Sequence, residues 1–171
     1  VSLLNGSTPG IHFPEDEHYI RRFRFSKTST LLPVLEGAGY KIEEDSYSPN
    51  TYCVEFPVKE PFFEKGKRDI SMWEQLEIAA QYQHYWADNS VSITVTFKPE
   101  EAEQIKDALE MYESRLKAVS FLKYEKTGYK QAPYEPITKE QYEEMIAKIT
   151  PIQKIETDDG GIGSKFCTND T

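Results

Sequence analysis

Val91-Ser92-Ile93-Thr94-Val95-Thr96-Phe97 is the stretch that decides the fold class of this chain. Its apolar residues alternate with small polar ones, which is the pattern of a strand with one buried face. A serine cap at Ser71, with Glu74 three residues later, opens a helix that runs to about Trp86, just before this strand. Pro99 lies in the first turn of a second helix just after it. A strand between two helices favours an α/β fold.

The same alternation continues in both directions along the chain. Predicted in chain order are a strand at 18–25, a helix at 30–38, a strand at 51–58, a helix at 99–116, a strand at 118–122 and a helix from Thr138. We therefore expect strand 91–97 to pair in parallel with its sequence neighbours. Residues 1–152 are expected to form one body, and the polar, glycine-rich residues 153–171 a flexible tail.

The composition limits the functions open to the chain. Its 171 residues, 38% of them hydrophobic, suffice for one packed domain. A formal net charge of −9 disfavours general nucleic-acid binding, because an acidic surface repels phosphate backbones. No apolar run approaches the length of a membrane span, and Val1–Gly10 lacks the pattern of a signal peptide. Two distant cysteines form no disulfide framework, which favours a reducing, cytoplasmic setting.

Few side chains are arranged for local catalytic chemistry. The sequence has no nucleophile elbow, Walker loop or dinucleotide fingerprint. His12, His18 and His84 match no common metal spacing, so we interpret them as packing or hydrogen-bonding residues and predict no metal site. We interpret several carboxylates as solvent-exposed helix positions: Glu100, Glu101, Glu103 and Asp107.

Two features near the start of the chain are each open to two interpretations. The basic cluster comprises Arg21, Arg22, Arg24 and Lys27. It is able to hold an anion, although ion pairs with the chain's many carboxylates are favoured. The turn dipeptides of residues 5–10 either present amides to an anionic ligand or simply connect two elements, and the second interpretation is favoured.

The two cysteines have different surroundings. Cys53 lies within a predicted strand among apolar residues and is interpreted as a buried, inert thiol. Cys167 follows a glycine-bearing segment near the end of the chain. It is either a tethered thiol that exchanges disulfides at a distance or a stray cysteine, and the residues alone leave both interpretations open.

Six short strings stand in a fixed order: Val1-Ser2-Leu3-Leu4-Asn5-Gly6-Ser7-Thr8-Pro9-Gly10-Ile11-His12, Tyr19-Ile20-Arg21-Arg22, Pro49-Asn50-Thr51, Tyr85-Trp86-Ala87-Asp88-Asn89-Ser90-Val91-Ser92, Lys117-Ala118-Val119-Ser120-Phe121-Leu122 and Gln131-Ala132-Pro133-Tyr134-Glu135. Together they resemble the last part of the adenosylcobalamin-dependent (class II) ribonucleotide reductases. The first resembles the segment after that family's Pro-Ser-Gly-Thr phosphate loop. The fourth is similar to its Trp-x-Asp-Asn-x-Val-Ser signature, and the fifth to its last barrel strand.

The resemblance implies the C-terminal portion of a reductase catalytic subunit, folded as the last strands and helices of a ten-stranded α/β barrel. The full enzyme would reduce ribonucleoside di- or triphosphates by thiyl-radical chemistry, with adenosylcobalamin as cofactor. Because the radical cysteine and the effector site would lie upstream of Val1, the chain alone is expected to be inactive. Implied partners are the ribonucleotide, thioredoxin or a similar dithiol, the rest of the reductase chain and a homodimer partner.

The same resemblance implies three site residues. Val1 and Ser2 would lie beside the substrate phosphate. Cys167 would be the first of a C-terminal cysteine pair that carries electrons from thioredoxin to the active site. Family members with a separate radical-generating subunit have adjacent tyrosines in the last barrel strand, whereas this chain has Ser120 and Phe121, which favours cobalamin. Two alternatives stay open: a non-catalytic binding or assembly module, and a tyrosyl-radical-class reductase with an altered relay.

Overall fold

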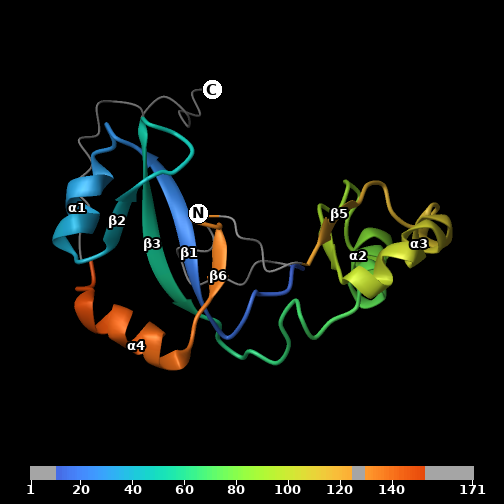
Figure 1. Cartoon of the computed structure of the whole chain (residues 1–171). Coiled ribbons are helices and arrows are strands. Elements are labelled where there is room, and N and C mark those ends of the chain that lie inside the picture. Colours follow the sequence, from blue (N-terminus) through green and yellow to red (C-terminus); the bar gives the residue numbers. More distant parts are fainter. Residues whose placement is uncertain (1–10, 125–129, 153–171) are drawn as a thin grey trace, which may run out of the picture.

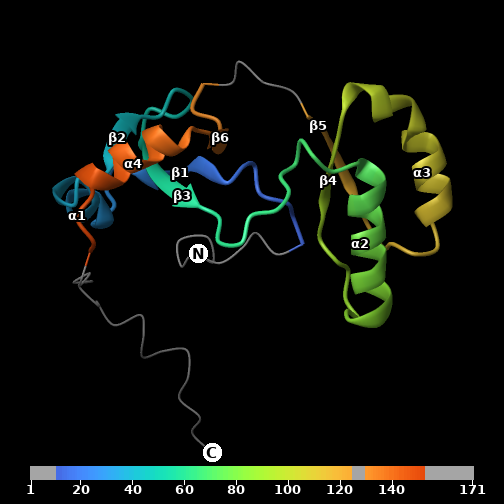
Figure 2. The same ribbon diagram turned by 90° about the horizontal axis from the view of Figure 1, so that it is seen from below.

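The computed structural model describes residues 11–124 and 130–152. Their elements gather around two separate sheets (Figure 1). We call residues 18–59 together with 131–152 the antiparallel lobe, and residues 70–124 the parallel lobe. Segments 11–17 and 60–69 run between the two lobes (Figure 2). Each lobe has its own hydrophobic cluster, and both sheets with their helices confirm the α/β class.

The antiparallel lobe is a four-stranded sheet with helices at its sides. In chain order its elements are β1 (His18–Ser26), α1 (Leu31–Gly37), β2 (Lys41–Glu44), β3 (Thr51–Lys59), β6 (Tyr134–Pro136) and α4 (Lys139–Lys148). The strand order is β2-β3-β1-β6, and every neighbouring pair is antiparallel. Leu32 and Leu35 of α1 pack on Val54 of β3, so the helix covers the apolar face of the sheet.

The pairing of β3 corrects one expectation. The strand predicted at 51–58 lies beside β1 in the antiparallel lobe and not beside strand 91–97. Only residues 45–50 separate β2 from β3, and so short a connection brings two strands together as an antiparallel hairpin. β2 and β6 were not predicted, because strands of four and three residues are too short to show an alternating pattern.

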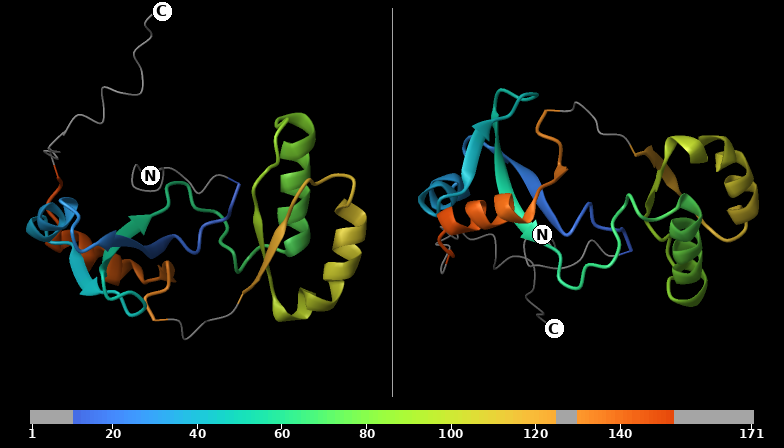
Figure 3. Two further views of the ribbon diagram at one scale, coloured as in Figure 1. Left: turned by 90° about the horizontal axis from the view of Figure 1, so that it is seen from above. Right: turned by 60° about the horizontal axis from the view of Figure 1, so that its bottom comes forward.

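The parallel lobe contains the stretch from which the fold class was predicted. Its elements are α2 (Met72–Tyr85), β4 (Thr94–Phe97), a 3₁₀ helix η2 (Pro99–Gln104), α3 (Ile105–Tyr112) and β5 (Ser120–Lys123). β4 pairs with β5 in parallel, which confirms the prediction for the neighbour that follows. Figure 3 shows α2 and α3 together on one side of the two strands. Buried between helices and strands are Met72, Leu76, Ala79, Ala80, Ile93, Val95, Ala108 and Tyr112.

The helix ends confirm several sequence signals and correct one. Ser71 Oγ accepts from the amide of Glu74 at 3.2 Å, as its cap position predicts. Gly39 follows α1 with a φ of +87°, the left-handed conformation expected of a glycine that ends a helix. The helix expected over 99–116 is instead η2 followed by α3, and it ends at Tyr112.

Candidate functional site

Three arginines of β1 hold one stretch of backbone, and we call Arg21, Arg22 and Arg24 the arginine clamp. Each guanidinium donates to a carbonyl of consecutive residues just before β6. The bonds are Arg24 Nη2 to Gln131 O at 3.2 Å, Arg22 Nη1 to Ala132 O at 3.0 Å and Arg21 Nη1 to Pro133 O at 3.1 Å. The clamp therefore joins two of the strings singled out in the sequence, which lie more than a hundred residues apart along the chain.

Two of the three clamp arginines, Arg22 and Arg24, form ion pairs with carboxylates of their own lobe. Arg22 Nη2 lies 2.8 Å from Glu55 Oε1 and 2.6 Å from Glu135 Oε2, and Arg22 and Glu55 are both buried. Arg24 Nε lies 3.1 Å from Asp45 Oδ2. Ion pairing was the favoured interpretation of the basic cluster, and these contacts confirm it.

The loop that carries the Trp-x-Asp-Asn-x-Val-Ser signature is folded around one glutamine, Gln83 of α2. Its Nε2 donates to the carbonyls of Ala87 at 2.9 Å and Asn89 at 3.0 Å, and its Oε1 accepts from the amide of Val91 at 2.9 Å. Lys117 Nζ donates to the carbonyl of Asp88, in the same loop. A single side chain thus satisfies three backbone groups that have no helix or sheet partner.

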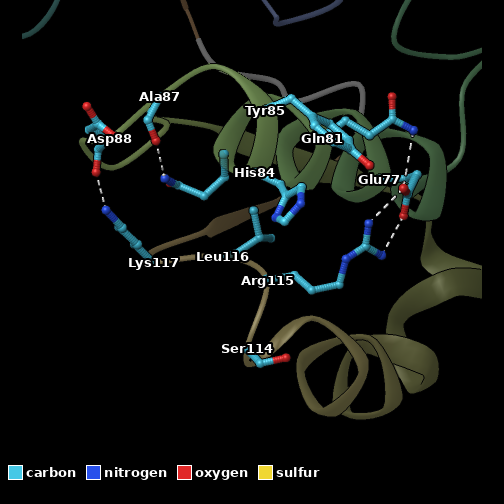
Figure 4. Close-up of a pocket in the computed structure, with 11 residues that line it drawn as sticks. Glu77, Gln81, His84, Tyr85, Ala87, Asp88, Ser114, Arg115, Leu116 and Lys117 are labelled. Carbon is cyan, nitrogen blue, oxygen red and sulfur yellow. Dashed lines mark hydrogen bonds and ion pairs between the residues drawn. The ribbon is translucent and has the colours of Figure 1, made fainter.

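A cavity of about 680 Å³ lies beside this loop, between the C-terminal half of α2 and the residues that lead into β5 (Figure 4). One wall is the pair of Glu77 and Arg115, whose two hydrogen bonds measure 2.7 and 2.8 Å. Hydrogen bonds from Arg115, and then from Gln81 and Tyr112, lower the pKa of Glu77 to about 2. His84 projects into the cavity, with its ring edge-on to Tyr85.

The other two histidines lie elsewhere. His18 is buried at the start of β1, with its ring 5.0 Å from that of Tyr142. His12 Nε2 accepts from the amide of Thr94 at 3.3 Å. Among the described residues, no group of three or more His, Cys, Asp or Glu side chains is placed to hold a metal ion.

The outer edge of β4 is closed by side chains. Both backbone groups of Thr96 bond to Gln75 of α2, the carbonyl to Nε2 at 2.7 Å and the amide to Oε1 at 2.9 Å. With His12 on Thr94, these bonds take the place of a neighbouring strand. The described end of the opening segment, which continues the string from Val1, is therefore held against β4.

Sequence reasoning missed some of the residues that build this site and misread one. Glu101, interpreted as solvated, is buried: Oε1 accepts from the amide of Met72 at 3.0 Å and Oε2 from that of Lys98 at 2.8 Å. It ties the starts of α2 and η2 together. Glu101 stands three residues after Lys98, the residue that precedes Pro99, and this is the spacing of a capping box. That spacing was the sequence signal that could have predicted its role.

Comparisons with known proteins show which protein family this chain resembles. No family model matches the sequence. Over 152 residues, 87% of the chain, it is 49% identical to an adenosylcobalamin-dependent ribonucleoside-triphosphate reductase of Euglena gracilis. Over 156 residues it is 45% identical to a probable reductase of the same name from Dictyostelium discoideum. A solved B12-dependent (class II) ribonucleotide reductase matches with a TM-score of 0.74 and 40% identity over 88% of the chain. The chain is homologous to a segment of the class II ribonucleotide reductases.

The class II reductases are much longer than the matched segment. The chain spans 21% of the Euglena and Dictyostelium relatives and 22% of the solved reductase chain. The arginine clamp and the Gln83 loop both involve strings that resemble this family. Val1, Ser2 and Cys167, the three predicted site residues, lie outside the described residues.

Proposed function

We propose that this chain is part of an adenosylcobalamin-dependent reductase that converts ribonucleoside triphosphates to 2′-deoxyribonucleotides in the cytoplasm. The observation that carries the proposal is 41–49% identity to eight reductases of that name over roughly nine tenths of the chain. These relatives are named as ribonucleoside-triphosphate reductases, which favours a triphosphate substrate over the diphosphate that the sequence also left open. Because the chain spans about a fifth of them, the full polypeptide and not this segment alone is proposed to turn over.

The proposed architecture is the C-terminal part of the family's ten-stranded α/β barrel. β5 pairs with β4 through one edge, and no strand within the described residues pairs with its other edge. Ser120 and Leu122 are exposed on the face of β5 opposite Phe121, which packs on the core of the lobe. An open edge next to an uncovered face is what an interrupted barrel leaves behind, so further strands of the polypeptide are proposed to complete it.

Adenosylcobalamin supplies the radical in such an enzyme. β5 supports this source, because it has Ser120 and Phe121 where a relay of radicals from a separate subunit would need adjacent tyrosines. Homologues named as cobalamin-dependent favour the same source over a tyrosyl-radical enzyme. We assign no described residue to the cofactor.

The roles of the undescribed residues are part of the proposal. Backbone amides at Val1 and the hydroxyl of Ser2 are proposed to bind substrate phosphate, since the family's phosphate loop immediately precedes this string. Cys167 is proposed to shuttle electrons from thioredoxin or a similar dithiol, because each ribose reduction consumes two electrons from thiols. A homodimer is a further proposed assembly.

The test is an assay of the full-length protein with ribonucleoside triphosphates and a dithiol, with and without adenosylcobalamin. Deoxyribonucleotide formation that requires the cofactor is expected, and its absence in folded full-length protein would overturn the proposal. Cys167→Ser should abolish turnover with thioredoxin and preserve turnover with a small dithiol. Ser2→Ala should raise the KM for substrate while kcat changes little.

A further inference from the structure

The C-terminal end of α2 has a second apolar face that the described structure leaves largely exposed. Tyr82 and Tyr85, three residues apart, lie on one side of the helix, and Trp86 follows directly at its C-cap. Tyr85 is 82% exposed and Trp86 85% exposed. We call these three residues the aromatic ridge. The opposite side of α2, through Leu76 and Ala80, is completely buried in the parallel lobe.

Exposed aromatic side chains on a helix that already buries its other face indicate an interaction site. Contiguous exposed apolar surface of this kind marks interaction sites, and tryptophan and tyrosine dominate the centres of interfaces. A surface helix typically has one apolar stripe and a polar opposite face. The ridge departs from that pattern at the end of α2 that adjoins the signature loop held by Gln83.

The cavity next to the ridge indicates the chemistry of the partner. Tyr85 and His84 form part of its lining, and Lys117 lies at its edge (Figure 4). Lys117 donates to the carbonyl of Asp88, and within the described residues it forms no ion pair with a carboxylate. Arg115, by contrast, is fully engaged by Glu77. Lys117 is therefore the lysine or arginine of the cavity lining that has no ion pair among the described residues, and it lies beside an aromatic surface, an arrangement that suits an apolar side chain with a carboxylate close to it.

We infer that the aromatic ridge and Lys117 form a docking surface for another segment of the same reductase polypeptide, one that carries an apolar side chain near a carboxylate. This rests on the proposed function, since it needs the longer chain of the relatives. Those relatives place about four fifths of their length outside the matched region. A segment of the same polypeptide has a high effective concentration at the ridge, so it can bind there even if its intrinsic affinity for the ridge is weak. The net charge of −9 makes a nucleic-acid partner unfavourable.

Photo-cross-linking in the full-length protein tests this inference. Trp86→p-benzoylphenylalanine keeps a large aromatic group at the ridge, and Tyr85→p-benzoylphenylalanine serves as a second position if the first variant misfolds. Lys106→p-benzoylphenylalanine, at an exposed position on α3, is the matched control. Irradiation of dilute protein should give intramolecular adducts with residues outside this 171-residue chain, with a yield several-fold above the control. Lys117→Glu should lower that yield.

Each other outcome overturns the inference. Mixing protein of two isotopic compositions separates adducts within one polypeptide from adducts between copies, and adducts between copies would point to a dimer interface. Adducts confined to these 171 residues, or a yield no higher than at position 106, would show that no segment outside this chain docks on the ridge. The reductase assay is independent of these results. An active enzyme without the adduct rejects the docking surface alone, whereas an adduct in an inactive enzyme rejects the proposed function alone.

Discussion

In the antiparallel lobe, the sheet face that carries Arg22 and Glu55 is held by ion pairs and by bonds to backbone carbonyls. In the parallel lobe, the buried face of β4 meets apolar side chains of α2 and α3, and its polar bonds lie at the strand edge. The two lobes therefore bury comparable strands with different chemistry. A buried ion pair is costly to break but adds little over an apolar pair, whereas apolar burial stabilises directly.

The difference follows from what each lobe has to hold. Residues 131–136 come from far along the chain, and the clamp fixes them through three carbonyl positions that apolar packing alone would not select. The elements of the parallel lobe are consecutive, and packing of an apolar helix face suffices to order them. In the antiparallel lobe, ion pairs and carbonyl bonds therefore add specificity of strand pairing to an apolar cluster, whereas the parallel lobe is stabilised mainly by apolar burial.

The largest effect is expected from Arg22→Ala in the antiparallel lobe. It removes both hydrogen bonds to Oε1 of buried Glu55, which keeps only an ion pair with Lys41 at 3.4 Å, and it frees the carbonyl of Ala132. Unfolding free energy should therefore fall by about 3 kcal/mol, the lower end expected for a broken buried pair. In a Cys167→Ser background, reaction of a thiol reagent with buried Cys53 reports opening of this lobe. Both tryptophans of the chain, Trp73 and Trp86, are in the parallel lobe, and their fluorescence should change little.

Two control variants separate the charge pair from the residue itself. Lys27→Ala removes an exposed pair with Glu44 and should leave the reactivity of Cys53 unchanged. Replacing Arg22 and Glu55 together by methionine should restore much of the lost stability, because both buried charges are gone. If the double variant is as unstable as Arg22→Ala, the bond from Arg22 to the carbonyl of Ala132 outweighs the ion pair.

In the parallel lobe, Leu76→Ala should cost about 2–5 kcal/mol, because the side chain is completely buried and the cavity left behind is not refilled. Tryptophan fluorescence during urea unfolding measures the change. Cys53 should remain as protected as before. Leu109→Ala on α3 is the control, since that leucine is half exposed and its loss should have little effect. If tryptophan fluorescence and Cys53 reactivity report the same loss of stability, the two lobes unfold as one unit.

The strongest local patterns in the sequence were confirmed by the structure. The alternation over 91–97, the cap at Ser71 and the helix start at Thr138 each have a local physical cause, and each element formed. Boundaries were less accurate: β4 begins at Thr94 and not at Val91, because Gln83 diverts Val91 into the loop. The split of residues 99–116 into η2 and α3 was not visible in the spacing of apolar residues.

Contacts between distant residues could not be predicted in the same way. The basic cluster was recognised, and ion pairing was the favoured interpretation, yet its partners at residues 131–135 are set by the fold and not by spacing. Gln75 and Gln83 were overlooked, because a glutamine that bonds to backbone is indistinguishable in sequence from a solvated one. The family resemblance was carried by strings such as Trp86–Ser92, and the relatives confirmed it.

A smaller effect is expected where the parallel lobe uses polar bonds, at the edge of β4. Gln75→Leu removes both bonds to Thr96 and leaves two buried backbone groups unpaired, so stability should fall by about 1–3 kcal/mol. Hydrogen exchange of the Thr96 amide should accelerate more than exchange in the core of α2. Gln81→Leu, on the exposed side of the same helix, is the matched control. An unchanged exchange rate at Thr96 would mean that the edge is closed by something other than Gln75.

The smallest effect is expected at the exposed ion pair of the parallel lobe, Glu77 with Arg115, whose consequence is a shift of pKa more than of stability. Because the pKa of Glu77 in the folded protein is lowered from 4.5 to about 2, the pair stabilises the protein above pH 4.5, and this contribution is lost as the pH falls toward 2. Arg115→Met should return the pKa of Glu77 toward 4.5, as measured by carbon-13 NMR titration of its carboxyl group. Lys106→Met breaks the long contact with Glu110, 3.8 Å apart, and should leave Glu77 unchanged. If Glu77 still titrates near pH 2 without Arg115, then Gln81 and Tyr112 set its pKa. Glu77 would then depend little on its arginine, in contrast to Glu55 of the antiparallel lobe, whose burial depends on Arg22.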